Sequence, residues 1–505
     1  EVTNSAAKLT SGADANGAWV DGLFYWGDGV NQNIRHNGTR VDQAMTDTPL
    51  TAATVAAGAA PGPTGTYTYY VTFQTADGKN SPASPKSAAI TVANLRVELT
   101  AIPTAPAGQD TSARAIWRNK NGSTVYYLLT TIAGNVVTTY TDQTIDADLS
   151  ATTLQSVLGE NFQNRRFPPC RFLIAHQNRL VGAFCTTSEG DKRTVFLSNR
   201  LEPWYCPITP DLEDPNQGSR FPLQDPNAGE ITGLVSHGSG VFVFTSSAAY
   251  QLVTSDQLLD YVLHRFSNNG CVAHRTIKSV KDMLIWASAN GIYMAQEGQG
   301  VRRISDDIKA TYQAISAADL AKSHAFVYDD KYFFCWPSGC RVYDLRFGIW
   351  SRNTAWLWRV SSVTSFTGSA MEKIYAAQNS SARVWQLETG ITDNGAAISA
   401  AWESHDFDIG LPGREKRLHY VNATWKLGAG TATVRLYRET GTTSIQNATQ
   451  NLATGDVTGA TVARLSQRCV EQARAERFRI RVEHADAAAT EYIMTQVDLL
   501  WSLST

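Results

Sequence analysis

Four of the nine histidines are the first candidates for chemistry, because imidazole serves both as a metal ligand and as an acid–base group. His176, His237, His274 and His324 each lie near the start of an apolar strand pattern, in four different repeats. Four histidines that converged on one axis would form a metal site. Their offsets within the repeats differ, so the sequence predicts no convergence and no metal ligand.

Acidic residues cluster at three places, and each place has a structural explanation. Residues 211–214 resemble a cation-binding loop but lack the glycine placement and closing glutamate of an EF-hand, so we predict a solvated loop. Asp306–Asp307 opens a predicted helix, where negative charge favours the positive end of the dipole, so we interpret the pair as helix-capping residues. Asp329–Asp330 separates two apolar strands and predicts a hairpin turn.

Catalytic and cofactor motifs are not found in the sequence. It contains no G-x-S-x-G, P-loop, H-E-x-x-H or strand-linked G-x-G-x-x-G pattern. The nearest match to the Asp box of propeller sialidases runs from Asp344 through Gly348 to Trp350, but its Asp–Gly spacing is wrong and no second copy exists. We therefore expect no enzyme, catalytic residue or cofactor, and expect Trp350 to be a packed aromatic residue.

Seven cysteines, an odd number, are scattered along the chain without a C-x-x-C motif: Cys170, Cys185, Cys206, Cys271, Cys335, Cys340 and Cys469. This spacing argues against a zinc ribbon. We predict reduced and mostly buried thiols, as suits assembly in a reducing cytosol. Cys335 and Cys340 flank Trp-Pro-Ser-Gly and are expected to be cross-strand neighbours.

Basic and aromatic clusters are few. Arg165–Arg166, Arg302–Arg303 and Arg414–Arg417 are short basic groups, which we interpret as surface or interface residues rather than DNA contacts. The stretch Trp350–Trp358 holds three tryptophans and fits either a sheet core, which we favour, or an exposed patch for a partner.

Composition limits the classes of protein to which the chain can belong. With 505 residues, about three domains are expected. Hydrophobic residues at 43% and charged residues at 18% exclude a disordered chain, a collagen and a coiled coil. Lys+Arg (44) and Asp+Glu (46) give a net charge of −2, which disfavours a general nucleic-acid binder. No apolar run approaches the roughly 18 residues of a membrane span.

Residues 1–150 predict strands at the N-terminus and then a small sandwich. In residues 1–45, Ala18–Trp26 and Asn31–His36 are expected to pair across a Gly-Asp-Gly turn. Residues 46–65 are small, Pro/Gly-rich and nearly uncharged, and predict a linker. Residues 66–150 show short strands between turn signals, and their pattern GxYxYxVTF…DGxxSxxS…RxIWR…TYTD resembles a fibronectin type III-like module. A short helix is predicted at Thr152–Leu158.

Residues 165–395 contain an irregular repeat of apolar strands and polar turns. Its units begin near Phe172, Thr232, Thr276, Lys322 and Ser361. Periods of roughly 40 to 45 residues with three or four strands are typical of a β-propeller, because stacked sheets bury both faces. With the N-terminal strands as a further, ring-closing unit, we predict about six blades.

Three further elements complete the predicted architecture. Helices are expected between blades at Ser255–Val262 and at Asp306–Ala321. Residues 400–505 predict a C-terminal β-sandwich of jelly-roll type. The fold class is therefore all-β: a propeller of about six blades, an inserted fibronectin III-like sandwich and a second sandwich.

Several segments together resemble one family. Residues 270–315 (GCVAHRTIKSVKDMLIWASANGIYMAQEGQGVRRISDDIKATYQAI) match the pattern hhWhSxxGIYhh followed by xxISxxI and a helix. Residues 327–352 (VYDDKYFFCWPSGCRVYDLRFGIWSR) match YDxxYhhhhPxxxxVYDLxxGxW, and residues 243–252 (VFTSSAAYQL) match hhFTxxxhYxh. With residues 19–39 and the fibronectin-like insert, the chain is similar over most of its length to the tail nozzle (tail tubular or stabilisation) proteins of short-tailed bacteriophages.

The resemblance implies a virion structural protein with no catalytic residues. In that family six copies form a ring below the portal and adaptor. The ring retains and then conducts double-stranded DNA, and tail fibres, spikes or a needle attach to it. A near-neutral charge suits a channel through which DNA slides without being held. The resemblance thus implies a homohexamer in the virion tail, assembled in the host cytoplasm without membrane insertion.

Two other functions fit the sequence. A carbohydrate-binding or carbohydrate-hydrolysing propeller would bring carboxylates or aromatic residues together at the mouth of its axis. An adhesion hub built on the fibronectin-like module would be a monomer with an exposed aromatic patch. For the nozzle, we expect the inserted domain at 61–150 to contact neighbouring subunits.

Overall fold

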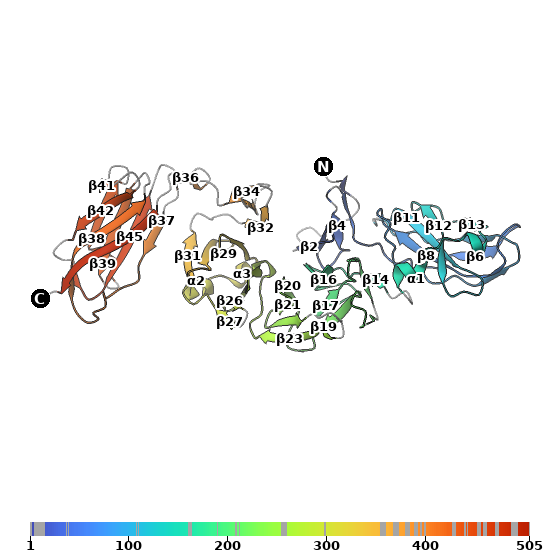
Figure 1. Cartoon of the computed structure of the whole chain (residues 1–505), viewed down its shortest axis with the longest axis horizontal. Coiled ribbons are helices and arrows are strands. Elements are labelled where there is room, and N and C mark those ends of the chain that lie inside the picture. Colours follow the sequence, from blue (N-terminus) through green and yellow to red (C-terminus); the bar gives the residue numbers. More distant parts are fainter. Residues whose placement is uncertain are drawn as a thin grey trace. The chain divides into compact units, whose positions relative to one another are not determined.

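The computed structural model divides the chain into two compact units, residues 1–352 and 353–505, and strands predominate in both (Figure 1). The structure describes the chain except for these residues: 1–2, 5–15, 37, 39, 108, 110, 160–163, 189, 208–209, 212, 254–259, 297–298, 354–359, 367–372, 379–383, 388–391, 394–395, 398–399, 427–430, 439–440, 442, 452–455, 458–461, 470–473, 486–492 and 504–505.

The first sheet is an antiparallel meander near the N-terminus, with one parallel strand added at its edge. Its order is β1-β5-β4-β3-β2. The strands are β1 (Thr3–Asn4), β2 (Asn16–Val20), β3 (Leu23–Gly27), β4 (Ile34–His36) and β5 (Arg40–Gln43). The segment Ala18–Trp26, expected as one strand, is two strands, because Asp21 and Gly22 adopt left-handed φ angles of 49° and 72° and form a tight turn.

A small sandwich follows, formed by two three-stranded antiparallel sheets. One sheet contains β6 (Thr54–Ala57), β10 (Val97–Thr100) and β13 (Tyr140–Asp142). The other contains β8 (Tyr69–Gln74), β11 (Ala113–Asn119) and β12 (Tyr126–Ala133), while β7 (Gly65–Tyr67) pairs with β9 (Ile90–Val92). The expected linker 46–65 therefore contains strands β6 and the start of β7. Its alanine-rich sequence gives little strand signal, yet Ala53 and Val55 pack into the sandwich core.

The exposed edge of β8 is covered by residues 80–88 rather than by another strand. Ser81, Ser84 and Ser87 recur every third residue. Their hydroxyl oxygens accept hydrogen bonds from the backbone N–H groups of Phe73, Val71 and Tyr69 at 2.9, 3.0 and 2.9 Å, respectively. A three-residue period is that of polyproline II, in which prolines between the serines are tolerated. The segment thus protects a sheet edge without forming a strand.

Four four-stranded antiparallel sheets follow in the first unit, each a simple meander in chain order. They consist of β15 (Phe172–His176), β16 (Arg179–Ala183), β17 (Thr194–Leu197) and β19 (Ser219–Pro222); β20 (Ile231–His237), β21 (Gly240–Thr245), β22 (Ala249–Val253) and β23 (Val262–Ser267); β24 (Lys278–Val280), β25 (Met283–Ser288), β26 (Gly291–Gln296) and β27 (Gly300–Arg303); and β28 (His324–Tyr328), β29 (Lys331–Trp336), β30 (Gly339–Asp344) and β31 (Ile349–Asn353). Their first strands begin within a few residues of the repeat starts expected from the sequence.

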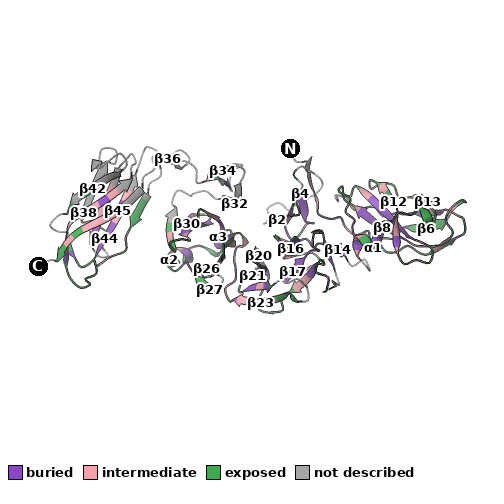
Figure 2. Cartoon of the chain, in the orientation of Figure 1, coloured by how far each residue is buried: buried purple, intermediate pink, exposed green. Residues whose placement is uncertain are grey.

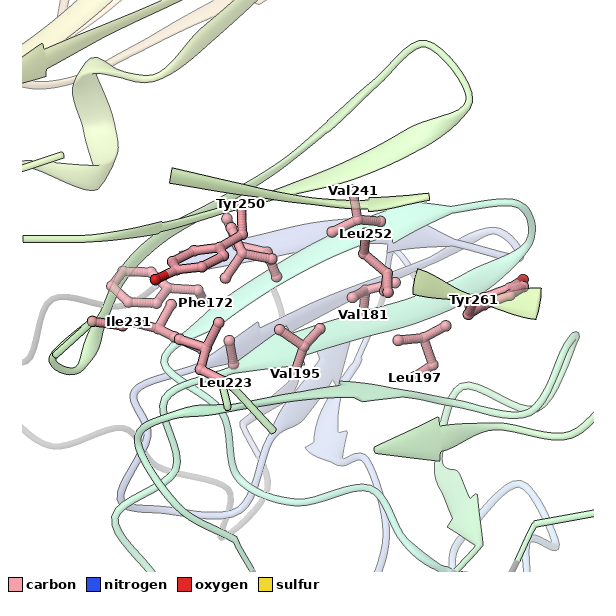
Figure 3. Close-up of a cluster of buried hydrophobic side chains, with 14 of the residues drawn as sticks. Phe172, Val181, Val195, Leu197, Leu223, Ile231, Val241, Tyr250, Leu252 and Tyr261 are labelled. Carbon is pink, nitrogen blue, oxygen red and sulfur yellow. The ribbon is translucent and has the colours of Figure 1, made fainter. Parts of the chain in front are cut away.

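The sheets stack in sequence, and neighbouring first strands lie together. β2 contacts β15, β15 contacts β20, β20 contacts β24, and β24 contacts β28. Each interface has its own apolar core; that between the sheets of β15–β19 and β20–β23 includes Val181, Leu197, Val241, Leu252 and Tyr261 (Figure 3). Inner strands such as β16 and β21 are therefore buried along their whole length (Figure 2), whereas the outer strands β23 and β27 are largely exposed. The arrangement is β-propeller-like.

Helices are short and lie between sheets. α1 (Leu154–Leu158) agrees with the predicted helix, and Thr153 caps it by accepting a hydrogen bond from the Ser156 N–H. The helix expected over 306–321 is two helices, α2 (Lys309–Gln313) and α3 (Ala317–Ala321), because Ser316 starts a new helix as its N-cap. The expected helix Ser255–Val262 falls largely outside the described residues, and Val262 begins β23.

A buried cluster joins the sandwich to α1 and to β18 (Tyr205–Pro207). β18 pairs with β14 (Asn164–Arg166). Leu154 and Leu158 of α1 pack with Trp117 of β11 and with Trp204. The Tyr205 hydroxyl donates a hydrogen bond to the carbonyl of Asn80. One face of the sandwich is therefore fixed against the strands that follow it.

The second unit begins with a three-stranded sheet of β32 (Val360–Phe366), β33 (Lys373–Gln378) and β34 (Val384–Leu387), followed by the pair β35 (Thr392–Asp393) and β36 (Ala396–Ala397). The region expected as one propeller, 165–395, therefore spans the division between the units. The first unit ends at Arg352 and the second begins at Asn353, immediately after the fourth four-stranded sheet.

The C-terminal part of the second unit is a β-sandwich. One sheet contains β37 (Ala400–Glu403), β44 (Phe478–Ala485), β39 (Thr431–Arg438) and β40 (Gln446–Asn451). The other contains β41 (Asp456–Val457), β42 (Val462–Arg468), β38 (Lys416–Lys426), β43 (Arg474–Ala475) and β45 (Ile493–Leu503). Leu418, Val421, Leu436, Phe478 and Ile480 form its core.

Candidate functional site

Two of the predicted histidines end the first strands of successive sheets. His176 is the last residue of β15, and its Nδ1 lies 2.8 Å from the Ser236 hydroxyl on β20. His237 is the last residue of β20, and its Nδ1 lies 2.8 Å from the Ser279 hydroxyl on β24. The same His–Ser bond thus links two consecutive pairs of sheets. Such bonds fix the angle between sheets and leave the Nδ1 atoms occupied by protein groups.

His274 lies where three elements meet. It belongs to a 3-10 turn, η4 (His274–Thr276). The Asn16 side-chain amide donates a hydrogen bond to its Nε2 at 2.8 Å, and its ring lies 4.7 Å from that of Phe172. His274 thereby connects β2, an edge strand of the N-terminal sheet, to β15 and to the start of the β24–β27 sheet. This residue is a structural bridge.

His324 lies in a basic environment. It begins β28, is 6% exposed, and its Nε2 has no hydrogen-bond partner among the described residues. Burial, with Lys278 and Arg275 nearby, lowers the pKa of His324 to about 4. Burial and Arg275 lower the pKa of Lys278 to about 8. Because all three groups are basic, burial and repulsion leave His324 neutral at pH 7.

The four histidines therefore occupy β15, β20, η4 and β28 with different neighbours. Within the described part of the chain, no three His, Cys, Asp or Glu side chains are grouped to hold a metal ion. Of the four, only His324 begins a strand; His176 and His237 end theirs, and His274 begins a 3-10 turn, so the expected placement near strand starts is wrong for most of them. The sequence pattern gave no sign of Lys278, which lies half-buried on β24 near Arg275 and His324.

A cleft of about 500 Å³ lies between the sheets β20–β23 and β24–β27. Phe242 and Phe266 form one aromatic wall, with ring centroids 5.2 Å apart in an edge-to-face arrangement. His237, Gln251, Asp282 and Gln296 supply its polar groups. Asp282 accepts a hydrogen bond from the Gln296 amide at 2.8 Å. A cleft with apolar walls and a few polar groups is able to hold a small uncharged ligand.

The acidic loop 211–218 is shaped by a buried arginine that the sequence analysis did not single out. Arg179 of β16 is 1% exposed. Its guanidinium donates hydrogen bonds to the carbonyls of Pro215, Gln217 and Ser198. Asp211 and Glu213 are exposed. The loop is thus held from beneath through backbone carbonyls, while its carboxylates face solvent as expected.

The other acidic pairs have the structural settings of turns. Asp329 and Asp330 form the predicted hairpin turn, with left-handed φ angles of 47° and 54°. Asp306 and Asp307 precede α2 without capping it; the N-cap position is Ile308 and no side-chain cap bond is present there. Asp306 instead forms an ion pair with Arg303. The expected capping role is therefore wrong.

The Asp344–Trp350 segment is a turn followed by a packed ring. The Asp344 carboxylate accepts a hydrogen bond from the backbone N–H of Arg346 at 2.9 Å and pairs with its guanidinium, which lowers the pKa of Asp344. Trp350 packs with Tyr343 at a centroid distance of 5.0 Å and donates a hydrogen bond to the Ile304 carbonyl. The expected packing of Trp350 is confirmed. Residues 354–359, with the other two tryptophans, lie outside the described residues.

The basic groups divide between surface and core. Arg165 and Arg302 are exposed, and Arg166 forms an ion pair with Asp47. Lys416, expected at the surface, is fully buried and donates hydrogen bonds to the carbonyls of Leu411 and Glu476. Backbone carbonyls that converge on one point stabilise this ammonium group, and the sequence carries no local signal of that convergence.

All seven cysteines are in the thiol form, and all but the half-buried Cys469 are buried, as predicted. Burial raises the pKa of Cys206 to about 11 and that of Cys271 to about 12. Cys335 and Cys340 are opposite each other on β29 and β30, which confirms the expected cross-strand placement.

Exposed apolar side chains gather in the loop between β12 and β13. Val136 and Val137 are 86% and 50% exposed. A turn between β30 and β31 exposes Phe347 at 72%. On the C-terminal sandwich, the paired Tyr420 and Leu500 are exposed. No helix in the described chain is long and apolar enough to cross a membrane.

Comparisons with known proteins leave the family open. No family model and no curated protein matches the chain. Among solved structures, the chain is similar to Hsv2 of Kluyvelomyces marxianus (10% identity, 56% of this chain and 69% of that chain, TM-score 0.26). PorZ of Porphyromonas gingivalis matches at 10% identity over 55% of this chain and 32% of its own, with a TM-score of 0.27. AztD of Citrobacter koseri matches at 10% identity over 64% and 94%, with a TM-score of 0.25. Likenesses of this size say nothing about function.

Proposed function

We propose that the chain is a subunit of the tail nozzle of a short-tailed bacteriophage, a virion structural protein without catalytic activity. The observation that carries the proposal is the position of the segments that resemble that family. Residues 243–252 form β21 and β22, residues 270–315 form the next sheet with α2, and residues 327–352 form β28 to β31. The segments that resemble the family thus lie on consecutive stacked sheets, and in each the strands and turns follow one another in the same order.

For the same reason, the sheets are proposed to form a propeller of six blades. Five successive sheets in the first unit provide five blades, and the sheet β32–β34 provides the sixth. The inserted sandwich is then the proposed fibronectin III-like module between the first and second blades.

The proposed assembly is a homohexamer below the portal and adaptor ring, with fibres, spikes or a needle attached to it. Double-stranded DNA passes through its lumen without sequence-specific binding. The net charge of −2 supports this role, because each phosphate that is gripped by a cation adds affinity through counterion release. The proposed location is the virion tail, after assembly in the host cytoplasm.

The inserted sandwich is the proposed contact between neighbouring subunits. Its β8–β11–β12 sheet packs on α1 and Trp204 of its own chain, so that face is already used. Val136 and Val137 project from its β12–β13 loop with large exposed apolar surfaces. Exposed apolar side chains that are adjacent in one loop are suited to bury against a second copy.

Light scattering and negative-stain imaging of the purified chain, alone and with portal and adaptor, test this proposal. We expect rings of about six copies, consistent with closed symmetric assembly. A Val136→Glu/Val137→Glu variant is expected to remain folded and lose the ring. Leu201→Glu, at a similarly exposed residue (55%) outside the sandwich, is the matched control and is expected to keep it. A chain that stays monomeric with portal and adaptor would contradict the proposal.

The second candidate function is carbohydrate binding, and the cleft between β20–β23 and β24–β27 favours it. Its aromatic wall suits the apolar face of a sugar, and its Asp and Gln side chains suit hydroxyl groups. A glycan array and a hydrolase panel, each with the wild type and Asp282→Ala, distinguish the two functions. Binding that depends on Asp282 in a protein that forms no ring would favour the carbohydrate alternative.

A further inference from the structure

Cys335 and Cys340 form a close thiol pair in the hairpin of β29 and β30. Their Sγ atoms lie 3.2 Å apart, and the side chains are 3% and 1% exposed. The hairpin register places Cys335 directly opposite Cys340 and Trp336 opposite Gly339. Both sulfurs therefore lie on the same face of the sheet.

The register also gives the pair the backbone separation that a disulfide needs. Only Pro337 and Ser338 separate Trp336 from Gly339, so these two residues close a two-residue turn as a hydrogen-bonded pair. Pairs alternate along an antiparallel ladder, so Cys335 and Cys340 form a non-hydrogen-bonded pair, with Cα atoms about 4.5 Å apart. Disulfides usually span Cα distances of roughly 4.4 to 6.8 Å. The pair can therefore be joined without moving the strands.

We propose that Cys335 and Cys340 are a modification site: a latent disulfide that forms when the assembled protein meets a small-molecule disulfide such as oxidised glutathione. In the first step one cysteine thiolate attacks a sulfur of oxidised glutathione, forms a mixed disulfide and releases one glutathione thiolate. In the second step the other cysteine attacks the protein-bound sulfur and displaces the second glutathione. Two protein thiols are oxidised and one glutathione disulfide is reduced.

Burial explains why the pair stays reduced during assembly. Burial and the neighbouring Cys340 raise the pKa of the Cys335 thiol well above its usual value, so little nucleophilic thiolate is present. The residue opposite Cys335 on β28 is His324, and its lowered pKa makes the imidazole too weak a base to generate the thiolate. Reaction therefore requires local opening of the hairpin and is expected to take minutes to hours.

The other cysteines provide an internal comparison. Cys271 is as buried as Cys335, its thiol pKa is also raised, and its Sγ donates to the Ala273 carbonyl at 3.2 Å. It has no sulfur neighbour among the described residues. If burial alone controlled oxidation, Cys271 and Cys335 would behave alike.

The chain offers a direct readout of the product. Cleavage after Lys331 and Arg341 releases residues 332–341 as one peptide that contains both cysteines. We would equilibrate the full chain with reduced and oxidised glutathione at pH 8, starting once from the reduced and once from the oxidised protein. Remaining thiols are then alkylated in denaturant, and the peptides are analysed by mass spectrometry. At the oxidised end, we expect this peptide to lose the mass of two hydrogens and carry no alkyl group, while Cys271 is alkylated.

Variants separate the pair from general oxidation. Cys340→Ser is expected to leave Cys335 as a thiol or a mixed glutathione disulfide and never to give the lighter peptide. The oxidised wild type is also expected to have a higher thermal midpoint than the reduced wild type. This comparison uses no substitution that could prevent folding. Alkylation of both Cys335 and Cys340 from both starting states would overturn the proposal. Equal oxidation of Cys271 would overturn it too.

Discussion

The inserted sandwich and the stacked sheets each bury an arginine, and they stabilise its charge in different ways. In the sandwich, Arg118 and Asp142 are both fully buried and form an ion pair at 2.6 Å, with Asp146 as a second carboxylate partner at 2.9 Å. In the first four-stranded sheet, Arg179 has only backbone carbonyls as its hydrogen-bond acceptors. Arg118 thus depends mainly on two carboxylates, with the Thr144 carbonyl as a further acceptor, whereas Arg179 depends on the shape of a loop.

The difference follows from the partners that each fold provides. Arg114, on the same strand β11 as Arg118, donates hydrogen bonds to the carbonyls of Pro103 and Gly134, so the sandwich contains both kinds of partner. Burial lowers the pKa of Arg179, and the nearby Asp214 carboxylate offsets this only in part. A buried charge with a single dominant partner is therefore the more vulnerable to substitution of that partner.

The largest effect is expected from Asp142→Ala. The substitution leaves the Arg118 guanidinium buried without the Asp142 carboxylate, and it removes the acceptor of the Tyr69 hydroxyl hydrogen bond. Loss of one partner of a buried pair costs about 3–5 kcal/mol. Hydrogen exchange of β8 and β11 in the full chain measures this cost. Asp146→Ala, at a half-exposed carboxylate, is the control and should cost much less; equal costs would mean that burial of the partner does not matter.

A smaller and more local effect is expected from Arg179→Met. The substitution keeps most of the apolar stem but removes the donors for the carbonyls of Ser198, Pro215 and Gln217. A loss of about 2 kcal/mol is expected, confined to residues 211–218 and to the β16–β17 edge. Proteolysis in this loop should accelerate while exchange in the sandwich stays unchanged. Faster exchange in both regions would remove the distinction between them.

His324 is another buried basic group, but it is buried in its neutral form, whereas the buried arginines keep their charge and donate hydrogen bonds. Its pKa is about 4 when folded, below the usual 6.5, so the unfolded chain binds the proton first as pH falls. The contribution of His324 to the free energy of unfolding is therefore complete above pH 6.5 and is lost as the pH falls towards 4. Between pH 6.5 and 5 the free energy of unfolding is expected to fall by about 2 kcal/mol. Urea unfolding at pH 7 and 5 should show a weaker pH dependence for His324→Gln.

His419→Gln is the matched control for that experiment, because His419 lies at the surface of the C-terminal sandwich beside Ser502. It should retain the wild-type pH dependence. The charged groups around His324 are Arg275 on η4 and Lys278 on β24, and Cys335 faces it from β29. If His324→Gln leaves the pH dependence unchanged, these neighbours do not control its titration.

The smallest effect is expected from Glu230→Ala. Lys192 and Glu230 pair at 2.8 Å, but their side chains are 42% and 54% exposed. A solvent-exposed pair contributes about 0–1 kcal/mol, so the urea midpoint should barely move. A loss as large as that of Asp142→Ala would show that pairing itself, rather than burial, determines the cost.

Much of the fold could be predicted from the sequence because alternation and turn residues are local signals. The repeat starts near Phe172, Thr232 and Lys322 coincide closely with first strands, and Asp329–Asp330 forms its turn. β6 was missed because Thr54–Ala57 has mostly small side chains, and its strand state depends on pairing with β10. The break at Ser316 was missed because its capping role overrides a continuous helical pattern.

The candidate site was less predictable, because it consists of contacts between sheets. The cross-strand cysteines could be inferred from a short hairpin, whose register is local. Lys416 and Arg179 resemble surface residues in sequence, and only the distant carbonyls that they contact reveal that they are buried. The cleft at Asp282 and Gln296 depends in the same way on the spacing of two sheets.

The ion pair between Asp47 and Arg166 joins the point where the chain leaves the first sheet to the point where it returns from the sandwich. A segment whose two ends are held together is exchangeable: a foreign domain with adjacent termini could be grafted in its place without separating the flanking strands. Trp204 and Tyr205, which the native sandwich covers, would need polar replacements in such a graft. The position is therefore a natural site for displaying a reporter or a binding module on this scaffold.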